Sequence, residues 1–446
     1  MGAGAGGVLG RRSSWLAILL GVGAIAVAGC GGSDDETGAT DSASSSGEPV
    51  EITFWHGQTQ GVAELLQQMI DEFNKTHPDI VVSKDSGGVN SDRMLQKVTA
   101  GLQADNYPDI AYIYGSDLAN LAGGDQLANL TDAIDSGAID WDRFEDAAVQ
   151  AVTVDDQPRA VPAFIDNLAV VYNKDIFDDA GMDYPTDDWS WDDFMSAAAE
   201  LNDPDAGIAG FGWPGTGDED TTWRIWPMII QGGGSILSED GESVGFDGPS
   251  GEQALAEIDK AAADGSVYID STAGSERMQQ LFASGKMAMN IAGPYSLPEY
   301  VDAGVNYGVV SLPSFTDEHT TIAGPDTWAV FDNGSDREAA AIEFLNWFSE
   351  PAQQIRWISE AGSLPLTTDI SDAKGYEQYK TSLPGLDKFI ENTKLAQTRP
   401  TVPEYPQISQ AMGKAIASVL YQKADPSEAL SQAVETANAE LQVPGP

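Results

Sequence analysis

The sequence predicts an α/β protein with two domains, and three observations support this prediction. Short strand-like runs alternate with amphipathic helices, a pattern typical of largely parallel sheets flanked by helices. Beyond an apolar start and a polar linker, about 400 residues remain, which is more than one hydrophobic core usually holds. Hydrophobic residues make up 42% of the chain, an ordinary share for a globular protein.

The alternation begins with a strand at residues 51–55, followed by a helix. This helix carries apolar residues at i, i+3, i+4, i+7, i+8 and i+11, which places them on one face: Val62, Leu65, Leu66, Met69, Ile70 and Phe73. Strands are then expected at residues 79–83 and 107–114, with a helix at residues 91–103 between them.

The same alternation continues towards the C-terminus. Strands are expected at residues 168–172 and 286–292 and helices at residues 189–202, 250–265 and 336–350. Ser190 is a plausible cap for the first of these helices, Gly265 ends the second and Pro351 stops the third. No internal repeat, coiled coil or second apolar membrane-spanning run is apparent.

The N-terminus has the features of an export signal. Arg11 and Arg12 precede an apolar run at residues 13–29 that is short for a membrane span and ends in small residues. Residues 27–30, VAGC, match the bacterial lipobox, and this resemblance implies cleavage before Cys30 and a diacylglyceryl group on its sulfur. Two acyl chains anchor a protein stably. An uncleaved anchor helix is the alternative, and the general secretory and twin-arginine routes both stay open.

Cys30 is the single cysteine, so no internal disulfide or cysteine-based metal cage can form. Residues 31–49 contain no large apolar side chain before Val50 and should form a flexible acidic tether reaching roughly 25 Å. We therefore expect a signal peptide at residues 1–29, a lipidated linker at residues 30–49, and a body held at the outer face of the cell membrane.

The formal net charge of −48 argues against nucleic-acid binding, which requires a basic surface. It also disfavours docking on anionic lipid. We interpret the charge as a solubilising surface, which could reflect adaptation to salt, and a specific cationic partner is the alternative.

Motifs for catalysis are absent from the sequence. The three histidines, His56, His77 and His319, show no metal-ligand spacing, and no nucleophile elbow, Walker A loop or calcium loop occurs. Paired carboxylates could serve a glycosidase, but 70 acidic residues make chance pairs abundant. We expect no enzyme activity, no cofactor and no metal.

Aromatic residues gather with polar partners where strands end. A sugar packs its C–H face on an aromatic ring, and its hydroxyls need hydrogen-bond partners. Six stretches fit this description and supply candidate ligand-binding residues: Trp55, His56, Tyr114, Ser116, Asp117, Phe164, Asp166, Asn167, Trp213, Trp223, Tyr295, Asp326 and Trp328. Taken singly, a Trp at a strand end is more often part of the core, and an Asp there is more often a helix cap.

Several of these motifs resemble one family. ITFWHG, FNKTHPDIVV, VPAFIDNLAVVYNKDIF and FASGKMAMNIAGPY together resemble extracellular solute-binding proteins of family 1, the maltose-binding type, which deliver sugars to ATP-binding-cassette importers. The resemblance extends over nearly all of residues 50–440. It implies a two-lobed periplasmic-binding-protein-like fold of type II, each lobe a mostly parallel sheet with flanking helices, and a ligand in the interlobe cleft.

The resemblance also implies approximate lobe boundaries. The N-terminal lobe would comprise residues 50–164 and 323–375, and the C-terminal lobe would comprise residues 168–318 and 380–446. The linking segments would lie near residues 163–168 and 319–325.

Some residues take expected roles from the family's motifs. Asp166 falls where relatives carry a cleft carboxylate, and Trp223 falls at an aromatic that precedes the WPMI stretch. Tyr295 stands where relatives carry Trp, and this difference keeps a stacking face. Arg399 and Tyr405 lie in RPTVPEYP, a stretch that often closes the cleft in relatives.

The expected function is capture of a sugar, an uncharged oligosaccharide, by lobe closure. The partners would be that ligand, the membrane permease subunits and the lipid attached to Cys30, with the protein as a monomer. A cationic or other non-sugar solute, a secreted glycoside hydrolase and a surface adhesin are the alternatives.

Overall fold

The computed structural model describes residues 48–58, 60–87 and 91–442. Residues 48–446 form one compact unit. The expected signal peptide, Cys30 and most of the expected linker lie outside the described residues.

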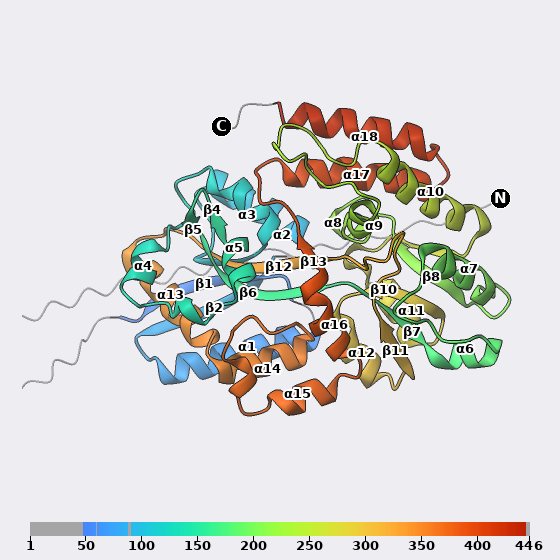
Figure 1. Cartoon of the computed structure of the whole chain (residues 1–446). Coiled ribbons are helices and arrows are strands. Elements are labelled where there is room, and N and C mark those ends of the chain that lie inside the picture. The colour runs from blue at the N-terminus through green and yellow to red at the C-terminus, as the bar shows by residue number, and fades with distance from the viewer. Residues whose placement is uncertain (1–47, 59, 88–90, 443–446) are drawn as a thin grey trace, which may run out of the picture. The chain divides into compact units, whose positions relative to one another are not determined.

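A first sheet combines strands from both ends of the compact unit (Figure 1). Its strands are β1 (Val50–His56), β2 (Ile80–Ser86), β3 (Ile110–Tyr114), β6 (Ala160–Asn167), β12 (Thr321–Val330) and β13 (Ala396–Thr398). The order is β13-β12-β3-β1-β2, and β6 also pairs with β12. β1 runs parallel to β2 and β3, whereas β12 runs antiparallel to β3 and β6 and parallel to β13.

Helices cover both faces of this sheet (Figure 1). They are α1 (Gln60–Thr76), α2 (Ser91–Gln103), α3 (Gly115–Ala122), α4 (Thr131–Asp135), α5 (Asp146–Ala151), α13 (Ser335–Phe348), α14 (Pro351–Ala361), α15 (Tyr376–Ser382) and α16 (Leu386–Asn392). A small hairpin of β4 (Thr153–Val154) and β5 (Gln157–Pro158) and the short helices η1 (Trp141–Arg143), η4 (Ile370–Asp372) and η5 (Thr393–Leu395) complete the lobe.

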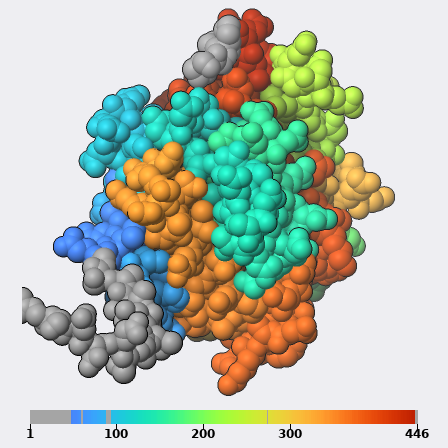
Figure 2. Space-filling model, turned by 90° about the vertical axis from the view of Figure 1, so that its left-hand side faces the viewer, coloured from blue at the N-terminus to red at the C-terminus, as the bar shows by residue number. Residues whose placement is uncertain are grey.

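The outer end of this lobe is seen in Figure 2, where the segment around α4 (teal) lies beside α13 (orange). The backbone amide of Asp140 donates to the side chain of Asn346 there. The predicted apolar face of α1 is buried, since Leu66, Met69 and Phe73 are fully covered. The apolar face predicted from the 3.6-residue periodicity is therefore confirmed.

The second sheet has the order β11-β7-β10-β8-β9. Its strands are β7 (Ala169–Asn173), β8 (Ala209–Pro214), β9 (Val267–Asp270), β10 (Met287–Ala292) and β11 (Tyr307–Val310). The helices around it are α6 (Lys174–Ala180), α7 (Trp191–Leu201), α8 (Glu219–Trp223), α9 (Trp226–Gln231), α10 (Pro249–Asp264), α11 (Glu276–Ala283), α12 (Leu297–Asp302), α17 (Tyr405–Leu420), α18 (Pro426–Glu440), η2 (Ala273–Ser275) and η3 (Pro294–Ser296).

This second sheet is mixed, which corrects the expectation that each sheet is mostly parallel. β8 runs parallel to β9 and β10, but β7 runs antiparallel to both β10 and β11. The reason lies in the connection: β7 follows β6 after a single residue, so its direction is set by the chain as it leaves the first sheet.

The helix ends behave as their residues predict. Ser190 caps α7, and its side chain and that of Asp193 form reciprocal hydrogen bonds with the backbone. Gly265 ends α10 at a φ of 77°, a left-handed conformation that glycine adopts without strain. Pro351 follows α13 and begins α14. At the first position of a helix the backbone N–H has no partner within the helix, so proline costs no hydrogen bond there.

The result is a two-lobed α/β fold with helix-flanked sheets. The chain passes between the sheets at β6–β7 and again near β12 and β13 (Figure 1). All residues of β6 and β12 are buried, which makes these two strands the centre of the molecule.

Candidate ligand-binding site

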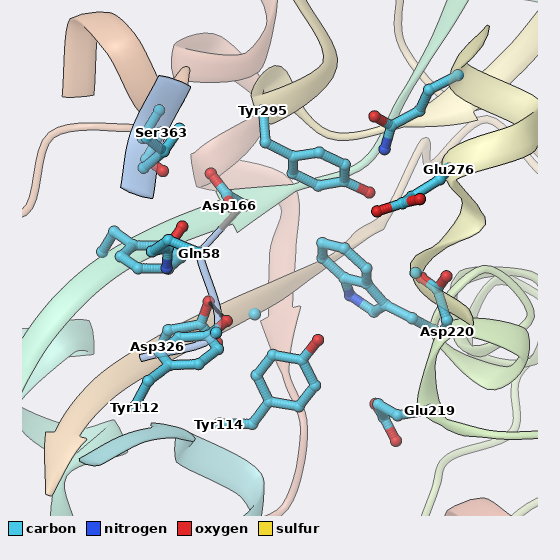
Figure 3. A pocket seen from close by; sticks show the side chains of 18 of the residues that line it. Gln58, Tyr112, Tyr114, Asp166, Glu219, Asp220, Glu276, Tyr295, Asp326 and Ser363 are labelled. Atoms are coloured by element: carbon cyan, nitrogen blue, oxygen red, sulfur yellow. Dashed lines mark hydrogen bonds between the residues drawn. The ribbon is translucent and has the colours of Figure 1, made fainter. Parts of the chain in front are cut away.

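A cavity of about 250 Å³ lies between the two sheets (Figure 3). From the first lobe it is lined by Gly57, Gln58, Val62, Tyr112, Tyr114, Phe164, Asp166, Gly324, Asp326, Ala361 and Ser363. From the second lobe it is lined by Glu219, Asp220, Trp223, Gly274, Glu276, Gln279 and Tyr295, and Arg399 comes from the segment after β13. Its volume is near the lower end of the range of small-molecule sites, about 300–1,000 Å³.

The pairing of β6 with β12 brings two carboxyl groups into this cavity. Asp166 lies opposite Gly324, and Phe164 lies opposite Asp326, so the alternation of strand side chains points all four positions to one face. A Cβ at Gly324 would come within 3.1 Å of the Arg399 guanidinium and 3.2 Å of the Trp223 ring. The glycine therefore leaves room for these two side chains.

Aromatic rings from both lobes form the apolar walls. Tyr112 and Phe164 stack with ring centroids 5.7 Å apart, and Trp223 and Tyr295 stack at 6.1 Å. Trp223 also has a buried indole N–H without an acceptor among the described residues. Burial raises the pKa of Tyr295 to about 12, so its hydroxyl stays protonated at neutral pH and can donate. The walls thus combine stacking faces with hydrogen-bond donors.

Arg399 connects the two lobes at the side of the cavity. Its guanidinium carbon lies 5.1 Å from the centroid of the Tyr114 ring and 5.9 Å from that of Trp223, distances typical of cation–π contacts. One guanidinium nitrogen donates to Glu219 Oε1 at 2.7 Å, and both side chains are buried. Arg399 is therefore held by an acidic partner before any solute arrives.

Glu219 receives two further hydrogen bonds from α17. The hydroxyl of Tyr405 donates to Oε1 at 2.8 Å, and that of Ser409 donates to Oε2 at 2.5 Å. This buried network ties α8 to α17 and fixes Arg399. Close by, Arg224 pairs with Asp220 at 3.2 Å and donates to the carbonyl of Ile291.

Asp166 and Asp326 have no comparable cation. They are 5% and 6% exposed. Burial, together with the nearby Asp326 carboxyl, raises the pKa of Asp166 well above its ordinary value. Burial also raises the pKa of Asp326 to about 7, although Arg399 and a 2.9 Å hydrogen bond from the Tyr112 hydroxyl act against this rise. Burial therefore favours the protonated form of both carboxyl groups.

The structure brings about half of the sequence-predicted site residues together. Tyr114, Phe164, Asp166, Trp223, Tyr295, Asp326 and Arg399 line the cavity. Trp55, His56, Ser116, Asp117, Asn167, Trp213, Trp328 and Tyr405 are not among its lining residues.

Three of these eight pack in or beside the cores. Trp213 is fully buried on β8, and its indole donates to the carbonyl of Thr221 at 3.1 Å. Trp328 lies two residues further along β12 than Asp326, which puts it deep in the lobe, edge-on to Phe54 at 5.0 Å. The Tyr405 hydroxyl donates a hydrogen bond to Glu219. In the structure these three side chains serve packing or positioning.

The other five lie outside the lining of the cavity. The ring of Trp55 is covered by the Lys97 ammonium at 4.0 Å, and His56 accepts from the amide of Gln58 at 3.2 Å. Burial and Lys84 lower the pKa of His56 to about 4, so it is neutral. Asn167 donates to the carbonyl of Phe389. Asp117 lies buried in the first turn of α3.

Ser116 lines a second cavity of about 440 Å³, also between the lobes, with α3 and α5 on one side and residues 230–237 on the other. Arg399 lines both cavities.

Sequence reasoning missed several lining residues. Tyr112 could have been predicted from the sequence, because it lies two positions before Tyr114 on one strand. The two side chains therefore share a face of the sheet. Glu219, Asp220, Gln58, Ser363, Glu276 and Gln279 carry no local signal, since each reaches the cavity only through the way separate segments pack.

Within the described ranges, no helix is long and apolar enough to cross a membrane. Within the same ranges, no group of three or more histidine, cysteine or carboxylate side chains could hold a metal ion.

Comparisons with known proteins agree with this architecture. The chain is 23% identical over 412 residues to the sn-glycerol-3-phosphate-binding periplasmic protein UgpB of Escherichia coli, covering 87% of this chain and 91% of that protein. It superimposes on a cyclic α-maltosyl-1,6-maltose-binding protein from Arthrobacter globiformis with a TM-score of 0.70 and 28% identity, covering 88% and 99% of the two chains. UgpB from Mycobacterium tuberculosis, in complex with glycerophosphocholine, matches with a TM-score of 0.79, 19% identity and coverage of 89% and 98%.

Two helix-flanked sheets with a ligand-sized cavity between them define the class of two-lobed solute receptors. The model of the bacterial extracellular solute-binding protein family matches residues 56–355. The chain belongs to this family.

Proposed function

We propose that this protein is the substrate-binding component of an ATP-binding-cassette importer and that it captures a saccharide between its lobes. The observation that carries the proposal is the cavity itself, in which aromatic faces and hydrogen-bonding groups from both lobes converge. Rings such as Trp223 and Tyr112 suit the C–H face of a sugar, and carboxyl groups suit its hydroxyls.

Some relatives bind a phosphate ester and others bind a saccharide, and the charge of the cavity bears on which of the two this protein takes. A phosphate ester needs cationic donors, and among the described lining residues Arg399 is the single cation. Its charge is already matched by Glu219 at 2.7 Å. Bringing a phosphate beside Asp166 and Asp326 would add repulsion in a buried site. We therefore favour a saccharide without an anionic group over glycerol phosphate, and the uncharged oligosaccharide expected from the sequence meets this condition.

The lobes can capture a solute because each lobe supplies part of the cavity lining. Trp223 and Tyr295 come from one lobe and Tyr112, Phe164 and Asp166 from the other, so a solute that contacts both sets stabilises the form in which they are close. The closed form would then dock on the permease subunits. Lipid on Cys30 would keep the monomeric body near them by raising its effective concentration.

Calorimetric titration of residues 48–446 with mono- and oligosaccharides tests this function, with sn-glycerol 3-phosphate as the anionic comparison. We expect saturable one-to-one binding of a saccharide, no product on chromatography and no binding of the phosphate ester. Tight binding of the phosphate ester alone would refute the saccharide assignment, and cleavage of the sugar would show a glycoside hydrolase.

A further inference from the structure

The cavity contains an unbalanced pair of carboxyl groups. Asp166 and Asp326 come from adjacent antiparallel strands, point to the same face and are both buried. Asp166 Oδ1 is buried and has no hydrogen-bond partner among the described residues, whereas the Leu364 amide and the Ser363 hydroxyl act on the carboxyl group and oppose the rise of its pKa. A buried acceptor without a donor is costly, so this atom is a place where a ligand donor is missing.

The two arginines nearest this pair already form ion pairs with other carboxylates. Arg399 is paired with Glu219, and Arg224 is paired with Asp220. Glu276, at the opposite wall, is exposed and adds negative charge. The nearest cation therefore offers the pair only partial compensation, and its effect is felt by Asp326 rather than by Asp166.

The remaining surroundings also suit a cation. The faces of Tyr112, Tyr114, Phe164, Trp223 and Tyr295 line the same cavity. Aromatic faces attract positive charge, most strongly where water is excluded. Two carboxyl groups and a set of rings around one small volume form a complete environment for an organic ammonium group.

We infer that the solute is a saccharide carrying a basic nitrogen, whose ammonium group lies between Asp166 and Asp326. This inference rests on the proposed function and narrows its substrate class. The neutral hydroxyls of such a sugar would face the same rings and donors as those of an uncharged sugar. The ammonium supplies the charge that the pair lacks, and one of its N–H groups reaches the unpartnered oxygen of Asp166.

Binding of an amine-bearing sugar should release protons, whereas binding of a neutral sugar should not. Burial and the closeness of the two carboxyl groups raise the pKa of both in the free protein, which favours a protonated pair. When the protonated amine enters, the carboxyl groups ionise, and the displaced proton leaves to the buffer. Binding should thus release up to about one proton per site.

The test uses saccharides that differ only at the nitrogen. Glucosamine, N-acetylglucosamine and glucose form one set, and the corresponding galactose derivatives and the α- and β-linked glucose dimers form others. At about pH 6, where the amines are cationic, we expect the free amine to bind at least about tenfold more tightly than both neutral members of its set. The binding enthalpy should change with the ionisation enthalpy of the buffer.

One isosteric double variant and one control locate the effect. Asp166→Asn with Asp326→Asn should abolish both the preference for the amine and the proton release. Asp183→Asn removes an exposed carboxyl outside the cavity lining and should leave the preference within about twofold. The wild-type proton count needs no variant, so it stands even if the double variant fails to fold.

Preference for the amine with proton release supports the inference. Equal or tighter binding of the neutral members, without proton release, overturns it and leaves the saccharide function intact. A preference that survives in the double variant shows that the nitrogen binds elsewhere. Absence of binding by every member overturns both the inference and the proposed function.

Discussion

Trp223 provides the cavity with both a stacking face and a hydrogen-bond donor. Its ring packs against Tyr295, and its indole N–H is buried without an acceptor among the described residues. We predict that Trp223→Ala weakens solute binding at least about tenfold, because a stacking contact and a donor are lost together. Calorimetry measures the change.

Trp223→Phe is the matched variant, because it keeps the ring and removes the N–H. Its affinity should lie between those of the wild type and the alanine variant. Unchanged affinity in Trp223→Ala, with an unchanged unfolding midpoint, would contradict this placement of the solute.

The pair of aspartates predicts a pH dependence of stability. The pKa of Asp326 is about 7 in the folded state and 3.8 ordinarily, so the folded protein binds the proton more tightly than the unfolded chain does. This contribution is present in full below about pH 4 and is lost as the pH rises through 7. The loss is at most about 1.4 kcal/mol per pH unit for each such group.

Urea unfolding of the solute-free protein between about pH 5 and pH 8 measures this slope. Asp326→Asn should flatten the curve relative to the wild type. If wild type and variant fall in parallel, Asp326 does not hold its proton in the folded state.

For single residues, the sequence motifs predicted some of the side chains that line the cavity and not others. Asp166, Trp223 and Arg399 were identified from motifs and line the cavity. Trp328 has the same local appearance, an aromatic beside an aspartate, yet it packs in the core. Sequence patterns show which side chains share a face, but how far along a strand the cavity reaches depends on which helices cover it.

Among the elements, α8 and α17 depend on one buried carboxylate. Glu219 accepts hydrogen bonds from Arg399, Tyr405 and Ser409, and Arg399 in turn contacts the first lobe through Tyr114. We predict that Glu219→Gln lowers the free energy of unfolding by about 3 kcal/mol or more, because the buried guanidinium loses its partner. Chemical denaturation checks this.

Glu276→Gln is the control for this experiment, since Glu276 lines the same cavity and is exposed. It should alter stability by less than about 0.5 kcal/mol. Equal effects of the two substitutions would show that the Glu219 network contributes little to the fold.

The elements themselves divide into those with local signals and those without. Residues 91–103 were expected to be a helix and form α2 with the same bounds. β12 was not recognised, because its sequence contains Gly324 and Pro325, which usually argue against a central strand. In the structure Pro325 pairs with β6 beyond the end of the β3 pairing, and a register shift follows at residues 326–327. That arrangement depends on partners more than 150 residues away in sequence.

For the whole molecule, alternating strands and helices were sufficient to predict an α/β architecture. The order of strands and the direction of β7 were not, because both depend on long-range pairing. The acidity of the chain did not predict that the solute cavity would contain two buried carboxyl groups without a matching cation.

The proposed anchor makes a separate prediction about the whole molecule. Cys30→Ala should shift the protein from the membrane fraction to the medium, because the two acyl chains can no longer be attached. Fractionation and immunoblotting measure the distribution, and the solute affinity of the released protein should equal that of the wild type. Retention of the variant on the membrane would point to an uncleaved anchor helix.

Titration of the body, residues 48–446, with matched amine-bearing and neutral saccharides shows whether the cavity binds a sugar. We predict one-to-one binding of a saccharide, and we expect Trp223→Ala and Asp166→Asn each to weaken this binding. Absence of binding by every saccharide, after unfolding and refolding to remove any retained solute, would contradict it and would leave the aromatic rings of the cavity as packing alone.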